Sequence, residues 1–150
     1  MEKTIVFKPI GVVHTPFEEG QKIPIQPRFS EAEGIVEIFP EYAEGLSDLD
    51  GFSHILLLWH IHRSVGYKLK VKPFLDTKLR GLFATRAPWR PNSIGLSLVK
   101  LLSIENNKLK VKGADMFNGT PLLDIKPYVP HFDERRDAQI QIGWLKNKLR

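Results

Sequence analysis

Residues 84–95 form the segment of this chain that is richest in groups able to do chemistry. Two prolines in this segment keep the backbone out of helix, so Arg86 and Arg90 are predicted to project from a stiff loop and to bind an anion with little loss of entropy. Trp89 between them offers a flat surface on which a base or a cation can stack. The alternative is a structural corner in which Arg86 or Arg90 is tied to backbone carbonyls.

Three histidines lie within the apolar run of residues 52–62. In a strand, His54, His60 and His62 would share one face, because side chains alternate with period two. Such a set can ligate a metal. Two leucines share that face and the chain has no cysteine, so a histidine that lines a pocket or is hydrogen-bonded in the core is the preferred interpretation. A metal-dependent barrel enzyme remains the weakest of three functional alternatives.

A third polar segment, residues 115–121, lies between two predicted strands. Asp115 and Asp124 place carboxylates on either side of it. Asn118 followed by Gly119 is also a signal for a type I′ turn, so a plain hairpin is the alternative to a functional loop.

The elements that must position these residues are predicted to be mostly strands, because prolines and glycines interrupt many short alternating segments. The fold class is mainly β, a small β-barrel or strongly curved sheet, since closure removes sheet edges. Two helical segments are expected, a short turn at residues 40–46 and a C-terminal helix at residues 138–149. A helix over 52–62 is the alternative to a strand there. The predicted strands cover residues 5–14, 34–39, 52–62, 68–72, 79–86, 94–104, 108–112 and 122–129.

Length and composition exclude several classes of protein. The 150 residues suit a single domain, predicted over residues 1–150. The absence of cysteine excludes thiol catalysis and disulfide scaffolds, and makes the cytoplasm the expected location. No apolar run is long enough to span a membrane, and no glycine-rich nucleotide-binding loop is present.

Charge is unevenly distributed along the chain. Residues 1–62 are acidic, whereas residues 63–90 carry eight Lys or Arg and one Asp. This basic block predicts a surface that binds a polyanion, and a solvated lysine face is the alternative.

Four separated motifs resemble one family. They are Asp-Gly-Phe-Ser-His-Ile at residues 50–55, Gly-Leu-Phe-Ala-Thr-Arg at 81–86, Arg-Pro-Asn-Ser-Ile-Gly-Leu-Ser at 90–97 and Asn-Gly-Thr-Pro-Leu-Leu-Asp-Ile-Lys-Pro-Tyr at 118–128. In order and spacing they resemble the TsaA-like family, which includes the TrmO-type tRNA methyltransferases. The resemblance implies a small β-barrel that binds S-adenosyl-L-methionine, a homodimer, and N6-methylation of threonylcarbamoyl-adenosine beside the anticodon of tRNA.

The resemblance also implies a set of site residues. Arg86 suits the carboxylate of the cofactor and Asp115 its ammonium group, while Leu96, Met116 and Phe117 would cover the adenine. The acceptor nitrogen must lose a proton, and His62 and Asp124 are both candidate catalytic bases. The basic block and Trp89 would contact tRNA through Lys68, Lys70, Lys72, Trp89 and Arg90. The implied cofactor contacts are Ile25, Gln26, Pro27, His62, Arg63, Arg86, Leu96, Asp115, Met116, Phe117 and Asn118.

The chain departs from the family pattern at several positions. Ile25 stands where many members have arginine, and Asn118 replaces a common aspartate. The larger bacterial members also carry a C-terminal extension. These departures favour, as the second functional alternative, a protein that binds S-adenosylmethionine or RNA without transferring a methyl group.

Overall fold

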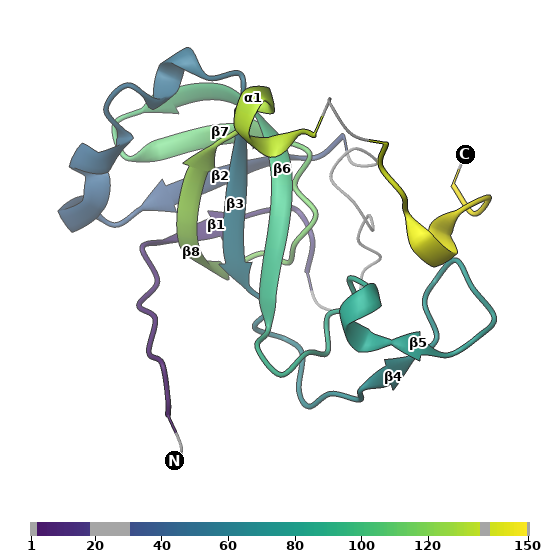
Figure 1. Ribbon diagram of the computed structural model, residues 1–150. Helices are drawn as coiled ribbons and strands as arrows, with labels where there is room; N and C mark the ends of the chain where they lie inside the picture. Colours follow the sequence, from purple (N-terminus) through teal and green to yellow (C-terminus); the bar gives the residue numbers. More distant parts are fainter. Residues whose placement is uncertain (1–2, 19–30, 136–138, 150) are drawn as a thin grey trace. The chain divides into compact units, whose positions relative to one another are not determined.

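The computed structural model describes residues 3–18, 31–135 and 139–149. The chain forms two compact units (Figure 1). The barrel unit consists of Met1–His62 and Ile94–Tyr128, and the second unit consists of Arg63–Ser93 and Val129–Arg150. A single domain over residues 1–150 stays a prediction.

Six antiparallel strands close the barrel in the order β1-β2-β7-β6-β3-β8. Closure gives every strand two neighbours, so the barrel presents no open ladder edge. The prediction of a mainly β fold built on a small barrel is therefore confirmed. The strands are β1 (Gly11–His14), β2 (Glu33–Ile38), β3 (His54–His60), β6 (Ile94–Glu105), β7 (Lys108–Lys112) and β8 (Thr120–Pro127).

Inward side chains at every second position fill the barrel. β3 alternates between buried Ile55 and Leu57 and half-buried neighbours, as the period of a strand requires. β3 lies between β6 and β8 in the sheet, and its outward side chains Leu56 and Leu58 are half-buried. The core cluster joins side chains from all six strands and includes Val13, Val36, Ile55, Leu57, Val99, Leu109, Val111 and Leu122.

The helices are short, as predicted. Residues 40–46 form a 3₁₀ helix, η2 (Pro40–Leu46), as expected. Near the C-terminus the predicted helix begins outside the described residues, and within them only η5 (Gly143–Leu145) forms. Positive φ angles at Gly143 and Asn147 prevent a continuous helix there. In the described part of the chain no helix is long and apolar enough to cross a membrane. The remaining helices are η3 (Leu49–Gly51), η4 (Leu82–Ala84) and α1 (Pro130–Asp133).

Several predicted strands differ in extent from the observed ones. The first begins at Gly11 rather than at residue 5, and the third covers His54–His60 rather than 52–62. The last ends at Pro127, two residues early. The excess residues do not extend the ladders, although Ile10, Ser53 and Tyr128 each share a backbone hydrogen bond with a strand residue.

One pentapeptide, Lys-Leu-Lys-Val-Lys, occurs twice, at residues 68–72 and 108–112. In β7 it forms a full strand between β2 and β6, and its leucine is completely buried. At residues 68–72 only β4 (Lys70–Val71) forms, paired with β5 (Arg80–Gly81), and Leu69 is 60% exposed. The strands predicted over 68–72 and 79–86 are therefore wrong in extent, because alternation cannot by itself supply neighbouring strands.

Gly11 gives a direct test of barrel closure. A Cβ at this position would overlap the Glu37 carbonyl oxygen of β2. Gly11→Ala is expected to lower the free energy of unfolding by about 1–3 kcal/mol, because backbone atoms must shift. Urea unfolding followed by circular dichroism measures it. Gly45→Ala is the control, since a Cβ at Gly45 meets no atom within 4 Å. Equal unfolding free energies for the two variants would contradict the close approach of β1 and β2.

Candidate functional site

The loop between β7 and β8, residues 113–119, crosses one end of the barrel. β7 and β8 are not neighbours in the sheet, so the plain hairpin considered for this segment is not formed. A type I′ turn needs positive φ at both central residues. Gly119 has a φ of 85°, but Asn118 is not among the positive-φ residues of the described chain.

The segment that follows β1 holds this loop in place. The backbone N of Thr15 donates to Asn118 Oδ1 (3.0 Å), and its hydroxyl donates to the Met116 carbonyl (2.8 Å). The backbone N of Asn118 donates to the Phe17 carbonyl (2.7 Å). These bonds join positions about a hundred residues apart and fix the loop before any ligand binds.

A chain of hydrogen bonds ends at Asp115. Trp59 Nε1 on β3 donates to Ser97 Oγ on β6 (3.0 Å), and Ser97 Oγ donates to Asp115 Oδ1 (2.6 Å). Gly95 makes room for the indole, because a Cβ there would overlap the ring. Two strands and the loop therefore fix the orientation of one carboxylate.

Burial raises the pKa of the Asp115 carboxyl to about 6, against the opposing effect of the bond from Ser97. A partly desolvated carboxylate is stabilised by a cation placed beside it. Oδ1 accepts the Ser97 bond, and the carboxylate has further lone pairs for a ligand. Asp115 is thus suited to bind an ammonium group.

The two candidate bases lie in different places. His62 Nδ1 lies 3.4 Å from Thr120 Oγ1, and the Thr120 hydroxyl donates to the Phe117 carbonyl (2.7 Å). Asp124 lies four residues further along β8, about 13 Å from Thr120 at the rise of a strand. Its Oδ2 lies 3.3 Å from Lys126 Nζ. The structure therefore brings His62, but not Asp124, to the loop.

The prediction that His54, His60 and His62 share one face of a strand fails for His62, because β3 ends at His60. The register with β8 also shifts between Leu58 and Trp59. His62 consequently lies off the strand. Across residues 3–18, 31–135 and 139–149, no three His, Asp or Glu side chains are grouped so that they could hold a metal ion.

The other predicted contacts in the barrel unit have different environments. Leu96 is exposed on β6, and Phe117 and Asn118 are half-buried. The Met116 side chain belongs to the buried core, so any contact from this residue to a ligand uses backbone atoms. Three predicted contacts lie outside the described residues: Ile25, Gln26 and Pro27.

In the second unit, Arg90 braces its own loop. Its Nη1 donates to the Thr85 carbonyl (2.9 Å) and to the Ala87 carbonyl (3.0 Å). The guanidinium carbon lies 5.9 Å from the centroid of the Phe83 ring. Arg90 thus forms the structural corner that the sequence offered as the alternative to an anion site. Three other residues predicted to contact the cofactor or tRNA are exposed: Arg63, Arg86 and Trp89.

A second cluster in this unit was not anticipated from the sequence. Trp144 Nε1 donates to the Ala84 carbonyl (2.7 Å), and the Arg80 guanidinium lies 5.6 Å from the Trp144 ring centroid. Arg80 Nε also donates to Asp76 Oδ2 (2.5 Å), which lowers the pKa of Asp76 to about 2. This cluster ties residues 143–145 to the β5–η4 segment.

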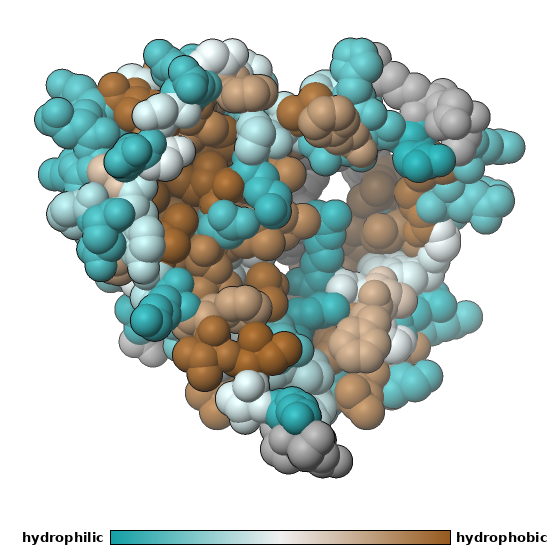
Figure 2. All heavy atoms as spheres, turned by 60° about the vertical axis from the view of Figure 1, so that its left-hand side comes forward, coloured by the Kyte–Doolittle hydropathy of each residue, from teal (hydrophilic) through white to brown (hydrophobic). Residues whose placement is uncertain are grey.

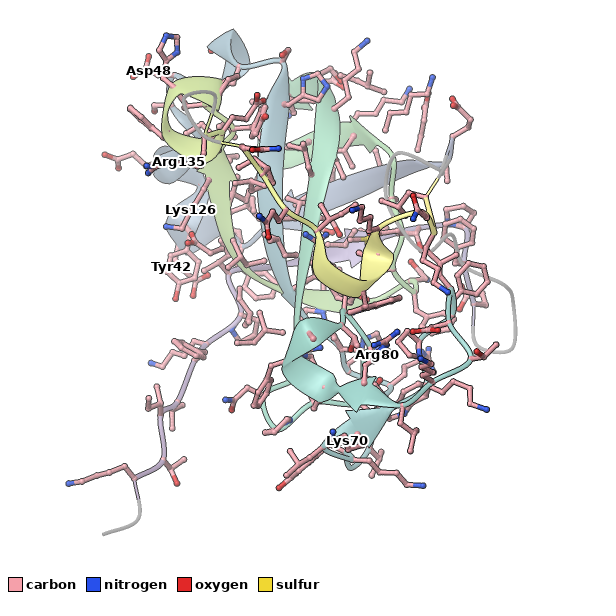
Figure 3. All side chains as sticks on the ribbon, turned by 45° about the vertical axis from the view of Figure 1, so that its right-hand side comes forward. Tyr42, Asp48, Lys70, Arg80, Lys126 and Arg135 are labelled. Atoms are coloured by element: carbon pink, nitrogen blue, oxygen red, sulfur yellow. The ribbon has the colours of Figure 1, made fainter. Side chains whose placement is uncertain are left out.

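Lys68, Lys70 and Lys72, three of the four lysines of the basic block, are exposed, and of these only Lys70 lies in a strand. Figure 3 labels Lys70. The strand predicted over 68–72 would place Lys68, Lys70 and Lys72 on one face, but β4 covers only Lys70 and Val71, so strand geometry does not fix such a face. Their exposure still makes all three available to an external anion.

Residues 12–134 match the family model described as the tRNA-methyltransferase O N-terminal domain. The chain belongs to this family. The match to the tRNA-methyltransferase O domain begins in β1 and ends just after α1, so it covers most of the described chain, including residues 113–119 and the loop braced by Arg90. The resemblance to the TsaA-like family is confirmed.

Individual members of the family agree with this assignment. A Pyrococcus abyssi protein named "Probable S-adenosyl-L-methionine-binding protein" is 48% identical over 97% of this chain and 78% of its own. A tRNA (adenine(37)-N6)-methyltransferase of Rattus norvegicus is 36% identical over 91% of this chain but 34% of its own. The crystal structure of TrmO from Pseudomonas aeruginosa superposes with a TM-score of 0.76 at 38% identity, covering 95% of this chain and 63% of the TrmO chain.

The raised pKa of Asp115 predicts a pH-dependent cost in stability. The pKa is about 6 in the folded protein against an ordinary value of 3.8. Asp115 therefore contributes most to the free energy of unfolding below about pH 4, where its carboxyl is protonated in both the folded and the unfolded chain. This contribution is lost as the pH rises through about 6, where the folded protein must ionise a buried carboxyl. Asp115→Asn keeps an acceptor for Ser97 and removes the titration. The difference in unfolding free energy between wild type and variant should change between these pH values and then level off.

Urea unfolding at a series of pH values measures this difference. Ser103→Ala, on the exposed surface of β6, is the control for general effects of pH. A wild-type-minus-variant difference that is independent of pH would show that Asp115 is not buried in the manner described.

Proposed function

We propose that this protein transfers a methyl group from S-adenosylmethionine to N6 of threonylcarbamoyl-adenosine beside the anticodon of tRNA. The observation that carries the proposal is the Asp115 carboxylate, which is desolvated and oriented by Ser97 and Trp59 in a loop fixed by Thr15. The family match and the name of the rat relative support methyl transfer to an adenine of tRNA.

The cofactor is held by groups complementary to its methionine end. Asp115 binds the ammonium group, and Arg86 binds the carboxylate through charge-assisted hydrogen bonds. Leu96 and Phe117 contact the adenine. Ile25, Gln26, Pro27 and Arg63 complete the proposed contacts. S-adenosylmethionine, when bound, supplies a methyl group whose transfer from the sulfonium to N6 leaves sulfur neutral and N6 with one proton to release.

His62 is the proposed acceptor of that proton. Because the Thr120 hydroxyl donates to the Phe117 carbonyl, its oxygen accepts from Nδ1–H of His62. This tautomer places the lone pair of the imidazole on Nε2, as a general base requires. Asp124, on the outer side of β8 beside Lys126, is not assigned this role.

tRNA is bound by the basic block, in which Lys68, Lys70 and Lys72 are exposed, and Trp89 stacks on a base. The catalytic form is a homodimer acting in the cytoplasm. A protein that binds S-adenosylmethionine without catalysis is the second candidate, favoured by the name of the P. abyssi relative.

Transfer of radiolabel separates the two candidates. Wild-type protein incubated with methyl-labelled S-adenosylmethionine should label tRNA that carries threonylcarbamoyl-adenosine, and should not label tRNA that lacks this modification.

In calorimetry, Arg86→Ala should weaken cofactor binding at least tenfold, since a charge-assisted bond of about 1.5–3 kcal/mol is lost. Lys78→Ala, another exposed cation of the second unit, is the control.

Cofactor binding without transfer would contradict the enzyme and support the binding protein. Absence of cofactor binding by the wild type would contradict both, and equal affinity in Arg86→Ala would remove Arg86 from the site.

The basic block predicts a salt-dependent affinity for tRNA. The logarithm of the binding constant should fall linearly with the logarithm of salt concentration, by about 0.7–0.9 for each phosphate neutralised. Changing Lys68, Lys70 and Lys72 to Ala should flatten this slope by up to about 3 units and leave cofactor affinity unchanged. The matched control is the same triple change in the identical pentapeptide of β7, at Lys108, Lys110 and Lys112, which should keep the slope. Equal slopes for the two triple variants would contradict the assignment.

A further inference from the structure

The N-terminal arm, defined as residues 3–9, is exposed along its length and belongs to no strand. Its centre is apolar: Ile5, Val6 and Phe7 are 77%, 78% and 65% exposed, between Lys3 and Lys8. β-branched and aromatic residues favour extended pairing, and an exposed extended segment of this kind is suited to bind another surface. In Figure 1 the arm runs out from β1, and Figure 2 shows hydrophobic side chains gathered at the lower end of the view.

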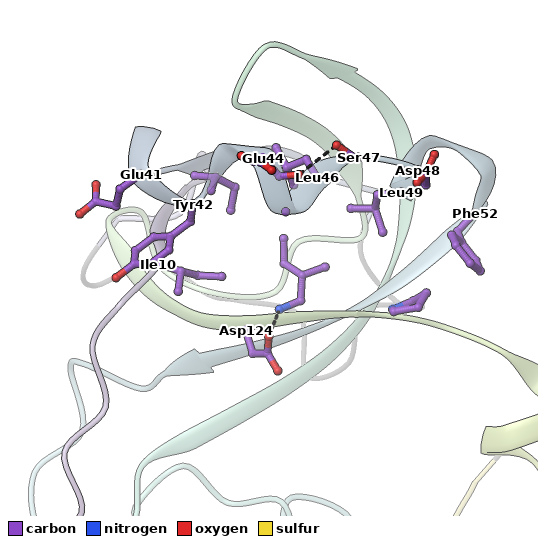
Figure 4. A pocket seen from close by; sticks show the side chains of 14 residues that line it. Ile10, Glu41, Tyr42, Glu44, Leu46, Ser47, Asp48, Leu49, Phe52 and Asp124 are labelled. Carbon is purple, nitrogen blue, oxygen red and sulfur yellow. Dashed lines mark hydrogen bonds between the residues drawn. The ribbon is translucent and has the colours of Figure 1, made fainter.

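A cleft of about 590 Å³ opens at the end of the barrel opposite to residues 113–119 (Figure 4). β8 connects the two ends, since it leaves the loop at Thr120 and reaches the cleft at Ile125 and Pro127. The volume lies in the range of about 300–1,000 Å³ typical of ligand pockets. The 3₁₀ helix η2 forms one wall of the cleft.

Arm and cleft are complementary in polarity and charge. The floor of the cleft is apolar and includes Leu46, Leu49 and Ile125. Its rim carries Glu41, Glu44 and Asp48, whereas the arm carries a lysine at each end of its apolar centre. Apolar side chains flanked by cations thus fit an apolar floor flanked by carboxylates.

The arm cannot readily turn back into the cleft of its own barrel. The backbone N of Ile10 donates to the Leu122 carbonyl (2.8 Å), and its carbonyl accepts from the backbone N of Phe39 (2.9 Å). Pro9 has a fixed φ, and the residue before a proline is held extended, so Lys8 cannot make the turn. The direction in which the arm leaves the barrel is therefore set by residues 8–10.

We propose that the arm of one copy docks in the cleft of a second copy, and that the second arm docks reciprocally in the first cleft. Ile10 lines the cleft and directly follows the arm, so the two surfaces are adjacent and both reciprocal contacts can form about one two-fold axis. This inference rests on the homodimer of the proposed function and identifies its contact.

Two charge-reversal variants test the exchange by sedimentation equilibrium, with circular dichroism to verify folding. K3E/K8E places an acidic arm against an acidic cleft. E41K/E44K/D48N places a basic arm against a cleft that then carries two lysines and only the carboxylate of Asp124 among the residues that line it. Each variant alone should have a dimer dissociation constant raised at least about tenfold, because like charges then face each other. An equimolar mixture should restore dimers, since both arms of the mixed dimer then meet an oppositely charged cleft. K108E, in the β6–β7 hairpin, is the control and should dimerise as the wild type does.

The outcomes separate this inference from the homodimer itself. Dimers as tight as the wild type in either variant, or a mixture that stays monomeric, would overturn arm exchange and leave the homodimer in place. A wild-type protein that is monomeric at micromolar concentration would overturn both the homodimer and arm exchange. An arm that binds the cleft of its own barrel would give this result.

Disulfide trapping tests the same contact directly, because the chain has no cysteine of its own. V6C protein mixed with S47C protein and oxidised with glutathione disulfide should give a covalent dimer on a non-reducing gel. Ser47 is exposed on the cleft wall, and S103C, at an exposed serine of β6, is the matched control partner. Equal dimer yields with S47C and S103C would contradict docking in the cleft.

Discussion

A strand of only four residues closes the barrel, and the rest of the structure depends on its two ladders. β1 pairs with β2 over four positions and with β8 over three. Gly11 permits the close approach to β2, and directly after the strand Thr15 and Phe17 bind the loop of residues 113–119. The segment that closes the sheet is thus also the segment that orients the candidate site. The loop is also anchored by its own buried side chains, Ala114 and Met116.

Charge is divided between the two units in a way that suits methyl transfer. In the barrel unit, burial raises the pKa of the Asp115 carboxyl, whereas the second unit carries the cations of residues 63–90. Because the cofactor brings the reactive group, the protein must supply orientation and a proton acceptor rather than a strong nucleophile. In the proposed function Asp115 orients the cofactor and His62 accepts the proton, and both residues belong to the barrel unit.

The sequence predicts the fold class and the segments of the site better than their geometry. Alternation located β7, yet the same five residues at 68–72 form only two residues of strand, because pairing depends on neighbours that local sequence does not encode. The sequence singles out residues 115–118 as a candidate functional segment, and this assignment stays a prediction. The two hydrogen bonds that join Trp59 to Ser97 and Ser97 to Asp115 could not be predicted from the sequence. They depend on the register of β3 and β6, which places Trp59 opposite Gly95. His62 was likewise placed on a strand that ends two residues earlier.

The most direct test of the central claim, that residues 113–119 form the cofactor seat, is amide hydrogen exchange with and without S-adenosylmethionine. Binding should slow exchange at the amides of Asp115 to Asn118, while the amides of η2 at the opposite end of the barrel keep their rates. Unchanged rates in the loop at a saturating cofactor concentration, or protection confined to η2, would contradict the claim.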